Sequence, residues 1–280
     1  MNEYNKVALI TGANSGVGFE LTKKLLSKGW EVVALIRSDF SAHDSMILEA
    51  IKMNHLRVYK ADLADFPNLR KALDLIKSRE GKLDLLFNNA GVSFEEHKYS
   101  KQGREIHFEV NTLVPYIISM ELKELLLKGR MKTIINTSSN SLLFLKQFNI
   151  DKLIQPKATR FKKLMGPYAN SKLALSLWTK RIAPEYFTEG IKIRSVCPGP
   201  SKTKLTKGKG MPSYMIPIRN LIFTHPSKGA SRLYEAVFNF SDEVTGIFIN
   251  KGKESEIKFS GHEEMILTQI NDIYQDEYIV

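Results

Sequence analysis

A tyrosine and a lysine four residues apart are the first sign of chemistry in this chain, in the stretch GPYANSK at 166–172. Residues i and i+4 are neighbours on a helix, so the Tyr168 phenol and the Lys172 ammonium would point the same way. A phenol has a reference pKa of about 10, and a nearby ammonium favours the phenolate and lowers that pKa. The pair therefore indicates proton transfer, although a core tyrosine beside a solvated lysine gives the same spacing.

Three glycines near the amino terminus indicate a second functional element. The stretch VALITGANSGVGFELTKKLLSKG places Gly12, Gly16 and Gly18 between an expected strand and an expected helix. Glycines at such a turn let the backbone approach a pyrophosphate, and the helix amino end offers unpaired N–H groups and a partial positive charge. The pattern predicts a dinucleotide site. A tight strand-to-helix turn without a ligand is the alternative.

The end of the second expected strand bears on the choice of dinucleotide. An acidic residue there would bind the ribose 2'-hydroxyl of NAD, but this chain reads VVALIRSD, with Ile36 and Arg37 at that end. A guanidinium can grip a 2'-phosphate, so the sequence favours NADP over NAD, with Ser15 as a further hydroxyl contact. The alternative is a surface arginine beside Asp39.

These residues need a scaffold, and the apolar pattern of the chain supplies one. Strand-length apolar runs alternate with longer segments of helical period, which predicts a parallel sheet covered by helices on both faces. We therefore expect an α/β, doubly wound Rossmann fold with about seven parallel strands. The expected strands are 6–10, 31–36, 56–60, 83–87, 132–137, 191–196 and 245–250, and the expected helices include 16–28, 66–79, 103–128 and 168–188.

We expect a single domain over residues 1–280, with two long segments that follow strand ends, where open α/β sheets bind ligands. The segment at about 140–165 is predicted to lie on the substrate side. The segment at about 198–225, which contains Gly208 and Gly210, is predicted to close over the cofactor as a lid. A packing helix is expected at about 262–276. Five apolar residues of the first segment either line a substrate pocket or pack onto the sheet: Leu142, Leu143, Phe144, Phe148 and Leu153.

Composition narrows the classes of partner. The chain has 41 Lys and Arg against 30 Asp and Glu, a net charge of +11, which suits anionic ligands such as nucleotides or a solvated basic surface. No nucleic-acid-binding motif accompanies the charge, so no nucleic-acid partner is expected. One cysteine excludes an internal disulfide, and the six histidines lack metal-ligand spacing, so no metal is predicted. No apolar run suits a membrane span or a secretory signal, which predicts a cytoplasmic protein.

Five motifs occur in the order typical of one family. They are TGANSGVG, which fits TGxxxGxG, then NNAG at 88–91, NTSS at 136–139, YANSK, which fits YxxxK, and PGPSKT at 198–203. The chain thus resembles the short-chain dehydrogenase/reductases of the shorter type, over residues 7 to about 205. Its retinol-dehydrogenase-like branch is the most similar. The resemblance implies hydride transfer between a nicotinamide and a carbonyl, or a primary or secondary alcohol, of a small substrate. An apolar substrate is expected from the apolar residues of the 140–165 segment.

The resemblance also implies a role for each matching position. Tyr168 would give or take the proton with Lys172 as its partner, and Ser139 would hold the substrate oxygen, with Ser138 as the alternative if the register is off by one. Asn111 would kink its helix and complete a proton relay through water. The implied cofactor-binding residues are Gly12, Asn14, Ser15, Gly16, Val17, Gly18, Arg37, Asp62, Leu63, Asn89, Ala90, Gly91, Tyr168, Lys172, Pro198, Gly199 and Thr203.

Two further points stay open at this level. A dinucleotide-sensing or interaction protein on the same fold is the alternative to an enzyme, although family members of that kind typically lack the Tyr/Lys pair. The segments 103–128 and 168–188 match the pair of helices that builds dimers in the family, so the resemblance implies a possible homo-oligomer.

Overall fold

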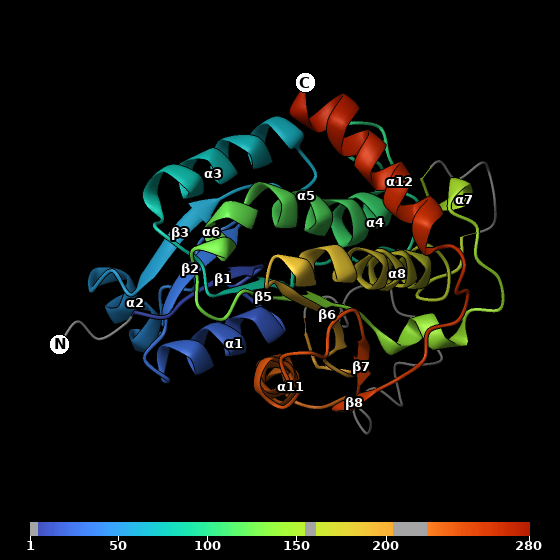
Figure 1. Ribbon diagram of the computed structural model, residues 1–280. Helices are drawn as coiled ribbons and strands as arrows, with labels where there is room; N and C mark the ends of the chain where they lie inside the picture. The colour runs from blue at the N-terminus through green and yellow to red at the C-terminus, as the bar shows by residue number, and fades with distance from the viewer. Residues whose placement is uncertain (1–4, 155–160, 204–222) are drawn as a thin grey trace.

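The computed structural model describes residues 5–154, 161–203 and 223–280, and one sheet runs through its centre (Figure 1). The strands are β1 (Val7–Thr11), β2 (Glu31–Ile36), β3 (Leu56–Lys60), β4 (Leu85–Asn88), β5 (Thr133–Thr137), β6 (Lys192–Cys197), β7 (Phe248–Asn250) and β8 (Lys253–Glu254). Their order is β3-β2-β1-β4-β5-β6-β7-β8. β1 to β7 pair in parallel, as predicted, and the short β8 adds an antiparallel edge that was not predicted.

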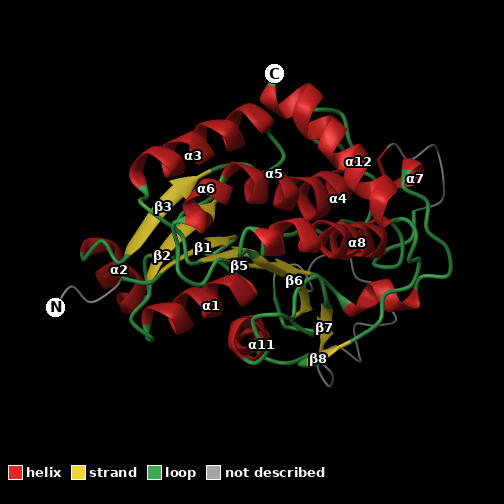
Figure 2. Ribbon diagram, viewed as in Figure 1, coloured by secondary structure: helices red, strands yellow, loops and turns green. Residues whose placement is uncertain are grey.

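Helices cover both faces of this sheet (Figure 2). One face carries α1 (Gly16–Leu26), α2 (Ser45–Lys52) and α11 (Pro226–Phe238). The other carries α3 (Phe66–Arg79), α4 (Ile106–Phe108), α5 (Val114–Glu121), α6 (Lys123–Leu127), α7 (Asp151–Ile154), α8 (Pro167–Thr188) and α12 (Glu263–Ile273). The doubly wound prediction is confirmed.

Strand side chains alternate between the two cores because the strand period is two residues. Val7 and Leu9 of β1 pack with α3, α5 and α8, whereas Ala8 and Ile10 pack with α1 and α11. Because the side chains on both sides of each strand face a core, nearly every strand position is apolar, which explains the continuous apolar runs.

The expected helix at 103–128 is interrupted. After α4 the chain forms a π-turn, η1 (Glu109–Leu113), before α5 and α6 follow. Pro115 lies four residues after Asn111 and has no N–H, so it cannot make the ordinary helical hydrogen bond to the Asn111 carbonyl. A proline at this spacing is a local reason for the wider turn, and π-turns of this kind often occur at functional sites.

The long segments of the sequence are partly visible. The first contains a 3-10 turn, η2 (Asn140–Phe144), and α7. The ends of the second pair through a bridge between Ser201 and Thr224, while the predicted lid, with Gly208 and Gly210, lies outside the described residues. Among the residues that the structure describes, no helix is long and apolar enough to cross a membrane.

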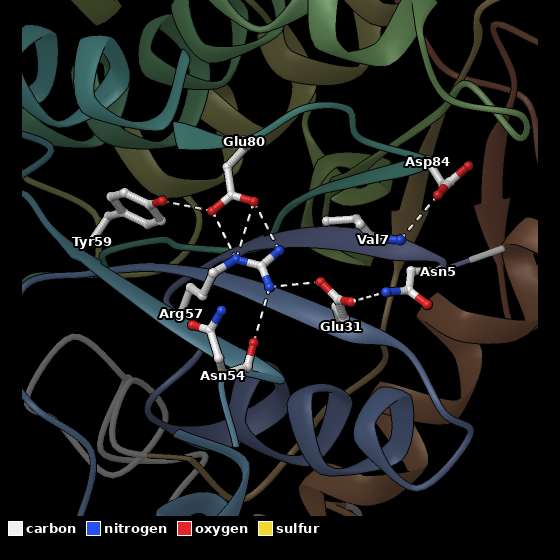
Figure 3. A network of polar contacts seen from close by, with 8 residues as sticks. All are labelled: Asn5, Val7, Glu31, Asn54, Arg57, Tyr59, Glu80 and Asp84. Carbon is white, nitrogen blue, oxygen red and sulfur yellow. Dashed lines mark hydrogen bonds and ion pairs between the residues drawn. The ribbon is translucent and has the colours of Figure 1, made fainter. Parts of the chain in front are cut away.

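A charged network ties the amino ends of β2 and β3 together, far from the ligand side of the sheet (Figure 3). Arg57 pairs with Glu31 at 2.6 Å and with Glu80 at 2.8 Å. The Tyr59 hydroxyl donates to Glu80 at 2.6 Å, and Asn5 donates to Glu31 at 2.6 Å. Because the Glu80 side chain is only 4% exposed, its charge depends on Arg57.

Replacing Arg57 by methionine is therefore expected to lower the free energy of unfolding by about 3–5 kcal/mol, the cost of leaving a buried charge unpaired. Chemical denaturation measures this. Lys60→Met on the same strand is the matched control, since Lys60 and its partner Asp39 are both exposed and such a pair contributes about 0–1 kcal/mol. Equal losses in the two variants would contradict the assignment.

Candidate active site

The glycine turn at the carboxyl end of β1 forms an open cradle at the start of α1. Gly12 and Gly16 have φ values of +66° and +56°, which favour glycine. A Cβ on Gly18 would lie 2.3 Å from the Gly12 carbonyl oxygen and 2.5 Å from Asn89 Nδ2, so a side chain cannot fit there. Ser15 is the exposed N-cap of α1, and its side chain does not cap the helix. These residues therefore fit a pyrophosphate held by backbone N–H groups.

The NNAG stretch at the end of β4 is bound to the end of β1. Thr11 Oγ1 accepts hydrogen bonds from the backbone N–H groups of Asn89, at 3.0 Å, and Ala90, at 2.9 Å. Asn89 Nδ2 also donates to the Thr11 carbonyl oxygen at 3.0 Å. The preceding Asn88 is buried and donates to Asn136 Oδ1 on β5 at 2.9 Å. The ends of three neighbouring strands are thereby fixed together below the cradle.

Arg37 at the end of β2 is exposed and makes no ion pair within the described part of the chain. Its neighbour Asp39 pairs instead with Lys60, at 2.7 Å. The alternative expected from the sequence, a surface arginine beside Asp39, therefore stays open, because Arg37 is exposed although it does not pair with Asp39. A guanidinium without an anionic partner is available to a ligand phosphate beside the exposed Ser15.

The remaining predicted cofactor residues have different surroundings. Asn14 Nδ2 donates to the Ser38 carbonyl oxygen at 2.6 Å. Asp62 accepts from the Ala64 N–H at 3.0 Å, and Leu63 packs against the core. The Val17 side chain faces α11 rather than the cradle, since its Cγ2 would lie 3.0 Å from a Cβ on Gly229.

The turn after β6 meets the glycine cradle from the other side. Thr203 lies against the start of α1, because its Cγ2 would be 3.0 Å from a Cβ on Gly16. Gly199 has a φ of +80°, and Arg232 of α11 donates to the Pro198 carbonyl oxygen at 3.0 Å. Arg232 belongs to no motif, so sequence reasoning missed it. Its contact follows from the packing of α11 under this turn.

Tyr168 lies in the first turn of α8, which begins at Pro167 because proline suits the first helical position. The Ser139 side chain lies near the Tyr168 phenol and favours its ionised form. Ser139 caps η2 and accepts from the Ser141 N–H at 3.2 Å. Ser138 is buried instead and hydrogen-bonds Ser176 of α8 at 2.8 Å. The structure therefore brings Ser139, and not Ser138, to the phenol.

Lys172 is buried one turn further along α8, where its Nζ donates to the Thr137 carbonyl oxygen at 2.7 Å. Burial lowers the pKa of Lys172 to about 7. Burial raises the pKa of Tyr168 to about 12, although the nearby Ser139 side chain opposes this rise. The sequence argument expected the ammonium to lower the pKa of the phenol. In the protein alone desolvation is the larger effect, because both groups lose water.

The lowered pKa of Lys172 predicts how the free energy of unfolding changes with pH. Below pH 7 the ammonium is charged in both the folded and the unfolded protein. Between pH 7 and about 10 the unfolded chain binds more protons, so stability rises with pH. Wild type should gain roughly 2–3 kcal/mol between pH 6.5 and pH 9 relative to Lys172→Met, as measured by urea denaturation. Parallel pH profiles for the two proteins would show that Lys172 keeps an ordinary pKa.

Asn111 is buried in the π-turn and clamps the loop that follows NNAG. Its Nδ2 donates to the Val92 carbonyl oxygen at 3.0 Å and to Ser171 Oγ at 3.1 Å, and its Oδ1 accepts from the Val92 N–H at 2.8 Å. The side chain is therefore fully engaged.

A cavity of about 470 Å³ adjoins the amino end of α8. Its wall is mainly apolar, and three of the five residues singled out in the sequence contribute to it: Phe144, Phe148 and Leu153. Leu142 is fully buried and Leu143 packs against the core. Some apolar residues of this segment thus line a cavity, and others pack onto the core. Asn170 lines the cavity. Because Tyr168 lies about 200° away around the helix, the cavity opens on a different side of α8 from the phenol.

His97 also lines this cavity, and sequence reasoning missed it because nothing in the motif pattern marks it. Both of its ring nitrogens are buried without a hydrogen-bond partner in the described part of the protein. Within the same described residues, no cluster of three or more His, Cys, Asp or Glu could hold a metal ion.

Comparison with known proteins identifies the family of this chain. The family model for short chain dehydrogenase matches residues 6–145, half of the chain. Retinol dehydrogenase 11 of Mus musculus is 28% identical over 274 residues, which cover 97% of this chain and 85% of the relative. Polyprenol dehydrogenase of Danio rerio is 25% identical, over 95% of this chain and 84% of the relative.

Solved structures agree in fold. A 4-hydroxyisoleucine dehydrogenase complexed with NADH has a TM-score of 0.67 and 24% identity, over 89% of this chain and 98% of that one. An NADPH-bound carbonyl reductase from chicken fatty liver has a TM-score of 0.65 and 22% identity, over 90% of this chain and 99% of that one. The chain belongs to the short-chain dehydrogenase family of nicotinamide-dependent oxidoreductases, in its retinol-dehydrogenase-like branch.

Proposed function

We propose that the protein is an NADP(H)-dependent oxidoreductase that interconverts a carbonyl and a primary or secondary alcohol on a small apolar substrate. One observation carries the proposal. Ser139 and the nearby Tyr168 lie at the carboxyl end of the sheet, together with buried Lys172. The glycine cradle at the end of β1 belongs to the same edge, where open α/β sheets bind their ligands.

In the reductive direction, a nicotinamide held beside the glycine cradle would supply the hydride for the carbonyl carbon, so negative charge would develop on the carbonyl oxygen. Ser139 donates a hydrogen bond to that oxygen, and Tyr168 gives it the phenol proton, so the product is the alcohol. In the oxidative direction Tyr168 accepts the proton instead. Both donors are held in place before charge develops on the substrate oxygen, so the positions of Ser139 and Tyr168 relative to that oxygen determine how well they stabilise the charge.

The proton that leaves Tyr168 must be replaced. Lys172 lies close to Gly91 and Asn111, since its Nζ would be 3.5 Å from a Cβ on Gly91 and Asn111 Oδ1 would be 3.2 Å from the same atom. We propose that a water held by the Asn111 carbonyl joins Lys172 to solvent. With a pKa near 7, Lys172 exchanges protons readily at neutral pH.

The unpaired guanidinium of Arg37 supports NADP over NAD, because it can pair with a 2'-phosphate that NAD lacks. The mainly apolar cavity at the amino end of α8 supports an apolar substrate. Phe148 and Leu153 would contact its apolar part. His97 offers its unpartnered ring nitrogens to a polar group at the distal end.

The alternative is a protein that binds the dinucleotide without turning it over. The experiment that separates the two measures NADPH consumption over a panel of aldehydes, ketones and quinones of graded apolar size. Turnover that grows with apolar size is expected for the proposed enzyme. NADPH binding without turnover of any panel member would favour the sensor.

A further inference from the structure

The C-terminal segment, residues 263–280, lies across the helices on one face of the sheet (Figure 1). It consists of α12 and the π-turn η4 (Tyr274–Ile279). Four of its side chains recur every four residues and are buried: Ile266, Ile270, Tyr274 and Tyr278. They join the same core as α5 and α8. The segment is thus an amphipathic strip with its apolar side on these helices.

Its aromatic contacts fall on the surfaces of α5 and α8. The Tyr116 ring meets the Trp178 ring edge to face, with centroids 5.6 Å apart, and meets the Tyr274 ring in the same way at 5.8 Å. The Tyr116 hydroxyl donates to Asn271 Oδ1 at 2.9 Å, and the Tyr274 hydroxyl donates to Glu121 Oε1 at 2.9 Å. Apolar contacts and these two hydrogen bonds therefore hold the segment on α5, whereas the buried Tyr278 hydroxyl and Gln269 Oε1 have no partner among the described residues.

Ion pairs fix the beginning of the segment on α8. Lys180 pairs with Glu263 at 3.1 Å, and Arg181 pairs with Glu264. The Glu263 side chain is only 13% exposed, so its pair with Lys180 is better shielded from solvent than the exposed pair of Arg181 and Glu264. The two glutamates also suit the amino end of α12.

The end of the segment reaches the turn that carries Asn111. Glu277 pairs with Arg104 at 2.6 Å, and Arg104 pairs with buried Glu109 at 2.7 Å. Glu109 is the first residue of η1. Docking of the segment is thereby linked, through one arginine, to the start of the π-turn.

These contacts cover α5 and α8, the helices through which a second copy would pair. The resemblance to the family implied pairing through 103–128 and 168–188, the segments that contain α5 and α8. We propose that the C-terminal segment occupies this face in place of a second copy, so the intact chain does not pair through α5 and α8. When the segment is released, the apolar face of α5 and α8 is exposed on every copy. Two copies can then pair symmetrically, because a self-complementary patch forms a closed dimer.

The test compares two full-length variants of the same helix. I266E/I270E places carboxylates on the buried side and is expected to release the segment. M265E/T268E adds the same charge on the exposed side and serves as the control. By light scattering at about 100 μM, wild type and the control should have the monomer mass of 31.9 kDa, and I266E/I270E twice that mass. A peptide of residues 261–280 should return I266E/I270E to the monomer mass, whereas the same peptide with both substitutions should not.

Two results would overturn the proposal: a wild-type dimer cross-linked through α5 and α8, or a folded I266E/I270E that stays monomeric. If circular dichroism shows that I266E/I270E is unfolded, K180E/R181E decides the question. It should raise the dimer fraction, and adding E263K/E264K should lower it again because the ion pairs are restored with reversed sign. A monomer in both of these variants would also overturn the proposal. Mass is measured without cofactor or substrate, so the result is independent of the proposed activity.

Discussion

Replacing Tyr168 by phenylalanine is expected to lower kcat by about 10²–10⁴-fold, the range that general acid–base groups supply. The phenylalanine ring keeps the packing of the first turn of α8 but removes the hydroxyl and its proton beside Ser139. NADPH binding should be nearly unchanged, because the glycine cradle and Arg37 do not depend on the hydroxyl. Stopped-flow turnover with the best panel substrate, together with NADPH fluorescence titration, measures both quantities.

Tyr234→Phe is the matched control, because Tyr234 lies on α11 and stacks on Phe238 rather than on the site. It should keep kcat within about threefold, as expected for a substitution outside the machinery. Ser139→Ala removes the partner and should cost about 10²–10³-fold in kcat, the loss typical of one oxyanion donor. A Tyr168→Phe variant with near wild-type kcat would remove the phenol from the mechanism.

The sequence alone predicts the sheet well because its strands are buried on both faces. The expected ranges 31–36, 56–60 and 66–79 coincide with β2, β3 and α3, where apolar period and caps act locally. Asp65, for example, caps α3 by accepting from the Asn68 N–H. The expected helix at 103–128 fails at η1, because a π-turn keeps the apolar content of a helix while changing its hydrogen bonds. β8 has only two residues, too few to show an alternating apolar pattern.

At the site, motif residues could be predicted and their environments could not. The ends of β1, β4 and β5 gather Gly12, Asn89 and Ser139 because parallel strands share one carboxyl edge. The direction of the Tyr168 pKa, by contrast, depends on how much water packing removes, which no spacing encodes. Arg232 and His97 come from segments without a motif, so only the packing of α11 and of the cavity wall brings them to the site.

The unexpected pKa values sharpen the mechanism. A phenol with a pKa of about 12 holds its proton at neutral pH, which suits the reductive direction. Oxidation of an alcohol needs the phenolate, and therefore needs added positive charge beside Tyr168.

Reversal of charge at Arg37 is expected to change the choice of cofactor. Arg37→Asp removes a guanidinium that has no other ion pair in the described chain, so the loss falls on the ligand rather than on folding. A charge-assisted hydrogen bond contributes about 1.5–3 kcal/mol, which corresponds to a rise of roughly 10- to 150-fold in the KM for NADPH. The new carboxylate can accept from a ribose 2'-hydroxyl, so the KM for NADH should stay level or fall.

Steady-state KM values for both cofactors, at a fixed concentration of the best panel substrate, measure this switch. Arg79→Asp controls for the loss of bulk positive charge, since Arg79 ends α3 at the amino edge of the sheet. That variant should affect both cofactors weakly, and its small effect should fade with salt because it acts only at long range. The Arg37 effect should persist for NADPH because it is a direct contact. Equal KM changes for NADPH and NADH in Arg37→Asp would instead place the 2'-phosphate elsewhere, and the preference for NADP would lose its structural basis.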